Sequence, residues 1–330
     1  MKRLGSGAVL LLASLFVASP ASAATTVWRL GTEAPDGSIW HAQLKSLAAK
    51  VSQASGGAVQ LQLFVGGAKG DDANIVRNLR TGALQAGSLG SPGAGLLASD
   101  VLAVDLPMLY ENVDERDFVL AQRRPALDGA LLDKGFVALS WSDLGSVRFF
   151  STTSRPTLPE MRKSKLLSGD DQSTAVWSAL GFAPVRVSSV ELVPSLQTGV
   201  IDAAATLPLV AFAARLHDKA KSMADLAWAS RTVTLVVSKS AWESVPADLR
   251  PRLTDVFREH GPLLTKGARV AETDSIAQMK AQGLTVVAVT DKVEWQKAAT
   301  AARDAIRGKV IDGSAIDAVT RLVAERRAKR

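Results

Sequence analysis

The sequence predicts an α/β protein made of two lobes, and three observations carry this prediction. Short apolar runs alternate with helical patterns from Val27 onward, an order that is typical of α/β domains with a largely parallel sheet. A second series of the same kind begins near Phe136. The chain has 330 residues, a length that suffices for about two domains.

The first series alternates strands and helices over the first third of the chain. Leu44, Leu47 and Val51 recur at helical spacing, and the Ser-Gly-Gly at 55–57 ends that helix. Asp71 or Asp72 is expected to cap the next helix, which runs to Arg80. The predicted strands are 27–30, 60–64 and 83–88, and the predicted helices are 39–54 and 72–80.

The second series contains more strands and one unusually long helix. The helical pattern from Pro246 to about Gln282 is interrupted by Pro262, which should kink or break the helix. Two further helices close the chain after a last strand. The predicted strands are 136–141, 148–151, 185–187, 201–204, 232–238 and 285–289.

The N-terminus has the pattern of a secretory signal peptide. Lys2 and Arg3 precede an apolar run at 8–18 that is too short for a membrane-spanning helix. The small residues at 21–23 match a signal-peptidase site. We therefore expect residues 1–23 to be removed, and the protein that begins at Ala24 to be exported to the periplasm.

Composition narrows the class of function. Hydrophobic residues make up 47% and charged residues 22% of the chain, which is typical of a packed globular protein. The net charge is +7, but the basic residues do not form a stripe with interleaved aromatics, so no nucleic acid partner is expected. Without Cys, the chain has no disulfide and no thiol for a lipid.

The chain shows no constellation for catalysis, a metal or a cofactor. Its three His residues are isolated from acidic residues at metal-ligand spacing, and neither a P-loop nor a dinucleotide fingerprint occurs. The acidic pairs at 71–72 and 170–171 are interpreted as helix caps or solvated loops. The segment 86–90 loosely resembles a nucleophile elbow but is better explained as a strand that enters a Gly-rich loop. We therefore expect a binding protein, not an enzyme.

Seven segments, taken in order, resemble one known family. They are VWRLGTEAPDGS (27–38), ASGGAVQLQLFVGGAKGDD (54–72), DLPMLY (105–110), LGSVRFFSTTSRPTLPEM (144–161), LGFAPVRVSSVELVPSLQTGVID (180–202), WESVPADL (242–249) and the long helix after it. This order is similar to that of TRAP-transporter periplasmic solute-binding proteins of the DctP family.

The resemblance implies a fold, a function and partners. The fold is a two-lobed clamp of the periplasmic-binding-protein kind, with a ligand cleft between the lobes and a long helix that crosses both. Lobe I comprises 24–147 with 231–272 returning to it, and lobe II comprises 148–230 with 273–330 returning to it. The implied partners are a small-molecule ligand, the small and large integral membrane subunits of the transporter, and, as an open alternative, a periplasmic accessory protein.

The departures from the family pattern concern the ligand. Leu167 occupies the position where acid-binding members have an Arg that pairs with the ligand carboxylate. Ala205 and Thr206 replace a Glu and an Asn of the family's pocket. Arg148 matches a second Arg that faces the ligand acid in some members, or it instead holds the lobe to a neighbouring carboxylate. These changes predict a relatively apolar or amphipathic ligand.

The candidate ligand-binding residues follow from the same alignment of motifs. Those matched to cleft positions are Glu33, Leu89, Gly90, Ser91, Arg148, Leu167, Ser168, Ser189, Thr206 and Leu207, and those offered as apolar walls are Trp40, Met108, Tyr110 and Phe212. Beyond these fourteen, Trp228 is a further candidate for an apolar wall. Two alternatives to transport stay open at this stage: a periplasmic sensing or partner-binding module with the same fold, and a secreted hydrolase.

Overall fold

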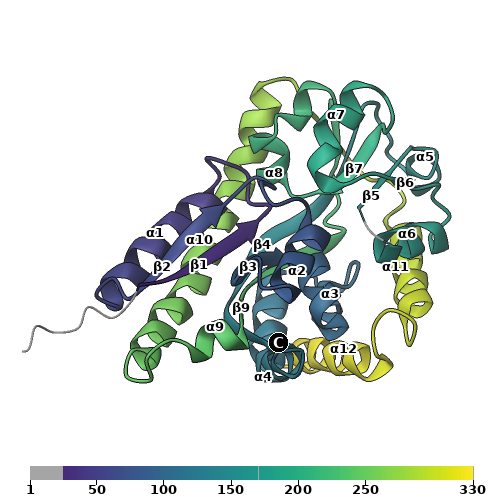
Figure 1. Cartoon of the computed structure of the whole chain (residues 1–330). Coiled ribbons are helices and arrows are strands. Elements are labelled where there is room, and N and C mark those ends of the chain that lie inside the picture. Colours follow the sequence, from purple (N-terminus) through teal and green to yellow (C-terminus); the bar gives the residue numbers. More distant parts are fainter. Residues whose placement is uncertain (1–24, 170, 330) are drawn as a thin grey trace, which may run out of the picture.

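The computed structural model describes residues 25–169 and 171–329, and it shows two lobes joined by extended strands and one long helix (Figure 1). The α/β fold class and the two-lobed architecture are therefore confirmed. The predicted signal peptide at 1–23 and Asp170 lie outside the described residues. None of the described helices is both long and apolar enough to cross a membrane.

The sheet of the first lobe is mixed, not largely parallel. Its strands are ordered β4-β9-β3-β1-β2, with β1 parallel to β2 and to β3. Strand β9 is antiparallel to both β3 and β4, because it carries the chain back from the second lobe. The bounds are β1 (Thr26–Thr32), β2 (Val59–Phe64), β3 (Ala86–Gly90), β4 (Phe136–Ser151) and β9 (Ala229–Ser238).

Side-chain caps begin the helices that pack on this sheet. Ser38 accepts a hydrogen bond from the His41 N–H at the start of α1, and Asp71 accepts one from the Asn74 N–H at the start of α2. The cap expected at Asp71 or Asp72 is therefore Asp71. The bounds are α1 (Ile39–Ala54), α2 (Asp72–Arg80), α3 (Ser91–Leu97), the 3₁₀ helix η1 (Ser99–Asp105), α4 (Val113–Asp133) and α9 (Lys239–Glu243).

The second lobe is built on the end of β4. Strands β7 and β8 pair antiparallel with β4, β10 pairs parallel with β8, and β5 pairs with β6 in a separate ribbon. The strands are β5 (Leu167–Ser168), β6 (Val185–Arg186), β7 (Ala203–Thr206), β8 (Ser222–Ala224) and β10 (Thr285–Val287). The helices are α5 (Leu158–Met161), α6 (Asp171–Ala179), η2 (Ser189–Glu191), α7 (Leu192–Gln197), α8 (Pro208–Ala213) and η3 (Leu216–Asp218).

One strand, β4, replaces the two strands expected at 136–141 and 148–151. The register shifts between Asp143 and Ser146, where Gly145 has a φ of 102° that favours glycine. The strand therefore bends without ending. Its partner changes from β9 at Val147 to β7 at Arg148, the two residues at which the sequence analysis divides the lobes. The division itself stays a prediction.

Helix α10 (Arg250–Ala281) crosses both lobes, as the resemblance implies. It contacts α1 in the first lobe, β4 between the lobes and α8 in the second lobe. Of the kink or break expected at Pro262, the break does not occur, because the helix continues through this residue. A Cβ at Gly261 would lie 2.2 Å from the carbonyl oxygen of Trp141, and glycine therefore lets the helix backbone lie directly against β4.

The two C-terminal helices pack on different lobes. Helix α11 (Lys292–Ile306) packs against α6, whereas α12 (Gly313–Ala328) packs against α4 and η1 (Figure 1). Helix α12 therefore lies on elements assigned to lobe I, and the return of 273–330 to lobe II stays a prediction.

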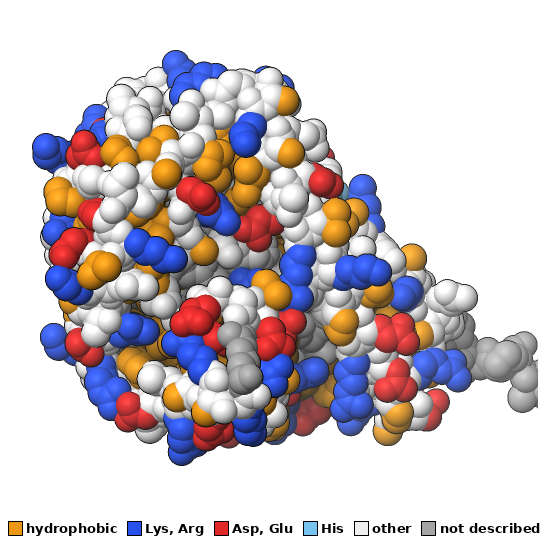
Figure 2. All heavy atoms as spheres, turned by 180° about the vertical axis from the view of Figure 1, so that it is seen from behind, with side chains coloured by type: hydrophobic (Ala, Val, Ile, Leu, Met, Phe, Trp, Pro, Cys, Tyr) orange, Lys and Arg blue, Asp and Glu red, His pale blue; other side chains and the backbone are white. Residues whose placement is uncertain are grey.

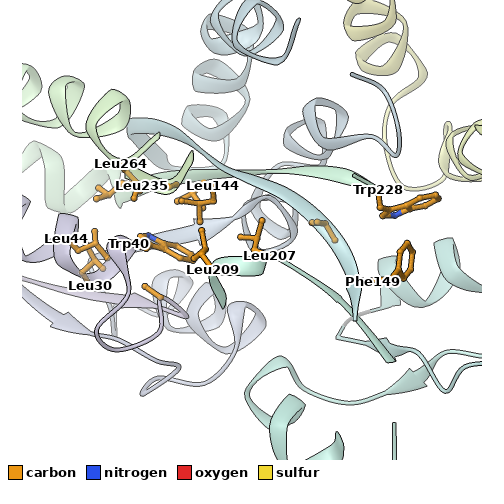
Figure 3. Packing of buried hydrophobic residues seen from close by; sticks show 14 of the residues in the cluster. Leu30, Trp40, Leu44, Leu144, Phe149, Leu207, Leu209, Trp228, Leu235 and Leu264 are labelled. Atoms are coloured by element: carbon orange, nitrogen blue, oxygen red, sulfur yellow. The ribbon is translucent and has the colours of Figure 1, made fainter. Parts of the chain in front are cut away.

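The main hydrophobic core is continuous from one lobe to the other. Figure 3 shows Leu30, Trp40 and Leu44 at one end and Phe149 with Trp228 at the other, all buried in one cluster. Leu207 and Leu209 lie between these groups (Figure 3). The rings of Phe149 and Trp228 are 5.7 Å apart in an edge-on arrangement.

Candidate functional site

A cavity of about 510 Å³ lies between the two lobes. In the first lobe, its wall is formed by residues at the carboxyl ends of β1 and β3 and by the first residues of α2 and α3. This is the place where open α/β sheets usually bind ligands. In the second lobe, the wall is formed by β5, α6, η2, α7, β7 and α8.

The wall from the second lobe is mostly apolar, and its polar side chains are Ser173, Ser189, Thr206 and Ser230. No charged side chain of the described residues 148–230 lines the cavity. The rings of Trp177 and Trp228 are 5.6 Å apart, so they form one aromatic surface. The apolar side chains of this wall include Leu167, Val176, Trp177, Val193, Ala205, Leu207, Val210 and Trp228.

The charged side chains of the cavity all lie on first-lobe elements or on β9. They are four carboxylates, Glu33, Asp71, Asp72 and Asp105, and one guanidinium, Arg231, among the described lining residues. Asp105 is held by Thr232, whose N–H and hydroxyl both donate to it. Arg231 donates to the Ser91 hydroxyl at 3.4 Å.

Glu33 and Asp72 form a close pair of buried carboxyl groups. One Glu33 oxygen, Oε1, accepts a hydrogen bond from the Asp72 N–H at 2.9 Å. Burial raises the pKa of Glu33, partly offset by hydrogen bonds from Ser189 and the Asp72 N–H. Burial and then the charge of Glu33 raise the pKa of Asp72 well above its ordinary value, and Arg231 offsets only part of this.

Two hydrogen bonds join the lobes across the cavity. The Ser189 hydroxyl donates to Glu33 at 2.5 Å, and the Ser188 hydroxyl donates to Asp71 at 2.6 Å. Burial opposes ionisation of Asp71, but the bonds from Ser188 and Asn74 leave the pKa of Asp71 below its ordinary value. The acidic side of the cavity is therefore also the contact that holds the lobes together.

Eight of the fourteen predicted ligand-binding residues line this cavity. Trp40 has a fixed position there, because its indole N–H donates to the Ser88 hydroxyl at 2.9 Å. The eight are Glu33, Trp40, Gly90, Ser91, Leu167, Ser189, Thr206 and Leu207. Whether each contacts a ligand stays a prediction.

Arg148 lies away from the cavity. Val147 lines it, and successive side chains of a strand point to opposite faces. Arg148 therefore points to the other face, where its guanidinium lies 3.2 Å from Asp225 and 3.7 Å from Glu272 of α10. Of the two interpretations of Arg148, the structure supports the ion pair that holds β4 to its neighbours.

The other five predicted residues also lie outside the cavity lining. Leu89 is fully buried in the core, and Ser168 is buried beside Ser173 and Thr174. The Tyr110 hydroxyl donates to the Val104 carbonyl. The last two of these residues, Phe212 and Met108, contact other parts of the protein. Phe212 stacks on His217, and Met108 lines a separate hollow beside α11 and α12.

Several residues of the cavity are not among the predicted ligand-binding residues, and two of them are the charged residues Asp72 and Arg231. Asp72 was interpreted as a cap or a solvated residue, and Arg231 was not singled out. Both carry detectable signals: Asp72 follows a Gly-rich loop at a helix start, and Arg231 is a charge next to a β-branched run at 232–238. Among the described residues, no group of three or more acidic or His side chains could hold a metal ion.

The fold and the cavity between its lobes are those of a two-lobed binding protein. The sequence model described as "Bacterial extracellular solute-binding protein, family 7", DctP, matches residues 30–308. The chain therefore belongs to this family.

Similar proteins share the fold over nearly the whole chain. The C4-dicarboxylate-binding periplasmic protein DctP of Rhodobacter capsulatus is 24% identical over 298 residues, covering 86% of each chain. A TRAP periplasmic solute-binding protein from Roseobacter denitrificans with bound β-D-glucuronate has a TM-score of 0.83 at 20% identity, covering 90% of this chain and 99% of that chain. DctP7 of Bordetella pertussis, an extracytoplasmic solute receptor binding pyroglutamic acid, has a TM-score of 0.84 at 18% identity, covering 91% and 100%.

Family membership places the chain in a functional class. DctP-family proteins are periplasmic binding proteins of transport systems, not enzymes; they bind small molecules and work with membrane components. Charged side chains of both signs are interspersed over the face in Figure 2, without a band of one sign. That face has no pattern typical of nucleic acid binding.

Proposed function

We propose that this chain captures a small, relatively apolar or amphipathic molecule and delivers it to a TRAP-type membrane transporter. The observation that carries the proposal is the second-lobe wall of the cavity, in which Leu167, Ala205 and Leu207 stand beside two tryptophans and no charged side chain. Binding in a largely apolar, concave site with a few polar groups is typical of small-molecule pockets.

The same wall argues against simple dicarboxylates as ligands. A carboxylate beside Leu167 would lose water without gaining a charge-assisted hydrogen bond, which is worth about 1.5–3 kcal/mol. Arg148 does not offset this loss, because it pairs with Asp225 and Glu272 on the other face of the strand. We therefore take the fold of this chain, but not its ligand, to be the same as in the solved relatives with bound sugar acids.

Calorimetric titration with succinate, malate and fumarate tests this specificity. We expect no tight binding of these three acids, whereas an amphipathic ligand should bind with a negative heat-capacity change from buried apolar surface. Submicromolar binding of any of the three dicarboxylates would overturn the proposed ligand class.

The partners and the export of the chain complete the proposal. We infer that the small and large integral membrane subunits of the transporter receive the closed, ligand-bound form. Neighbouring genes for these two subunits would support transport over sensing. We also infer cleavage after Ala23, in which case periplasmic protein begins at Ala24.

A further inference from the structure

The Glu33–Asp72 pair leaves one buried oxygen that the protein does not use. Asp72 Oδ2 accepts a hydrogen bond from the Gly93 N–H at 3.0 Å. Asp72 Oδ1 is also buried, yet it accepts no hydrogen bond from any described residue. Buried carboxylate oxygens normally have partners, since a buried unpaired acceptor is costly. The Asp72 side chain lines the cavity but this oxygen is turned away from it, so a rotation of the carboxyl group is needed before a ligand can supply the missing donor.

The surrounding charge specifies what kind of donor fits. Arg231 is the single cation of the described cavity lining, and it is not within ion-pair distance of either Glu33 or Asp72. Its charge offsets only part of the effect that burial and mutual repulsion have on the pKa of Asp72. A ligand cation would stabilise the ionised forms of Glu33 and Asp72, whereas a ligand anion would be repelled by those ionised forms.

The rest of the cavity determines which chemical character the remainder of the ligand can have. The second-lobe wall includes Leu167, Val176 and the rings of Trp177 and Trp228, and none of its described side chains carries a charge. A ligand that spans the cavity therefore has a polar end towards Asp72 and an apolar end towards the tryptophans.

From these observations we propose that the cleft selects an amine: an ammonium group donates hydrogen bonds to Asp72 Oδ1 and to the Glu33 carboxylate, and an apolar body packs on the second-lobe wall. This inference rests on the proposed function and adds the chemical class of the ligand's polar group. It also couples binding to closure. The ammonium keeps Glu33 ionised, and ionised Glu33 is the stronger acceptor for the Ser189 hydroxyl of the other lobe.

The test uses two matched series of probes on the protein purified from the periplasm. The aromatic series is phenethylamine, phenethyl alcohol and phenylacetate, and the alkyl series is hexylamine, hexanol and hexanoate. Calorimetry should show that an amine of at least one series binds about tenfold more tightly than its alcohol and its acid, as expected when a charge-assisted hydrogen bond is added.

Variants assign this preference to the carboxyl pair. Asp72→Asn keeps an acceptor for the Gly93 N–H but removes the charge, and it should weaken amine binding about tenfold or more. Glu33→Gln provides an independent test if Asp72→Asn does not fold. Asp36→Asn is the matched control, because Asp36 is exposed and does not line the cavity, so it should leave the amine's affinity unchanged.

The outcomes separate this inference from the proposed function. If no amine binds while acids or alcohols do, or if the amine binds Asp72→Asn and Glu33→Gln as tightly as wild type, the amine inference is overturned and ligand capture by the cleft stands. If no probe of any class binds and the periplasmic protein carries no small molecule, both are overturned.

Discussion

Replacing Leu167 with Arg should convert the cavity into one that accepts acids. Leu167 is half-buried and lines the apolar wall of the second lobe, so a longer side chain there can reach into the cavity. An Arg–carboxylate pair is charge-assisted and can be bidentate, and it contributes about 1.5–3 kcal/mol. At about 1.4 kcal/mol per tenfold, Leu167→Arg should bind D-glucuronate or succinate roughly ten- to a hundredfold more tightly than wild type.

Calorimetric titration of wild type, Leu167→Arg and Leu167→Met measures this gain. Leu167→Met is the matched control, because it conserves volume and adds no charge, and it should show no gain for either acid. A melting curve establishes that Leu167→Arg is folded. If the folded Arg variant binds both acids no better than the Met variant, the reasoning about the missing cation is refuted.

Three further predictions concern stability and closure. Gly261→Ala should lower the free energy of unfolding by about 1–3 kcal/mol or more, because its Cβ would meet the Trp141 carbonyl, whereas Gly129→Ala, with open space around it, should be neutral or stabilising in urea melts. Burial, with a smaller contribution from Lys50, lowers the pKa of His260 from 6.5 to about 4, so the unfolded chain binds more protons in this window and stability should fall as pH drops from 6.5 to 4. Compared with wild type, His260→Gln should lose roughly 2–3 kcal/mol less between neutral pH and pH ~4.5, and an equal loss would contradict this assignment. Ser189→Ala should speed ligand release in stopped-flow experiments by removing the bond to Glu33, while Ser244→Ala at the C-terminal cap of α9 should not; equal release rates would refute the role of this bond.

The order of strands and helices could be predicted because it depends on local patterns. Leu44, Leu47 and Val51 follow the helical period, and the structure buries all three on one face of α1. Local patterns do not show how the chain passes from one lobe to the other. The two strands expected around Gly145 are one, because a single glycine with positive φ lets β4 bend and continue. Pro262 was expected to kink or break its helix, yet the helix continues through it while packing against β4.

A residue of the site could be predicted from the sequence where its position in a motif is enough to place it in the cavity. Gly90 ends β3, Ser91 follows it and Glu33 follows β1, and all three line the cavity. Arg148 shows the limit of such reasoning, because its motif match says nothing about which face of β4 its side chain takes. Asp72 and Arg231 come together only through the packing of α2 against β3 and of β3 against β9, which no local pattern encodes.

The central claim is that the cleft holds an amphipathic molecule and not a simple dicarboxylate or sugar acid. Native mass spectrometry of the protein purified from the periplasm, followed by identification of the released small molecule, tests this claim most directly. We expect a bound compound with a substantial apolar portion, and we expect it to be displaced neither by succinate nor by D-glucuronate. Recovery of a dicarboxylate or a sugar acid as the bound compound would contradict the account.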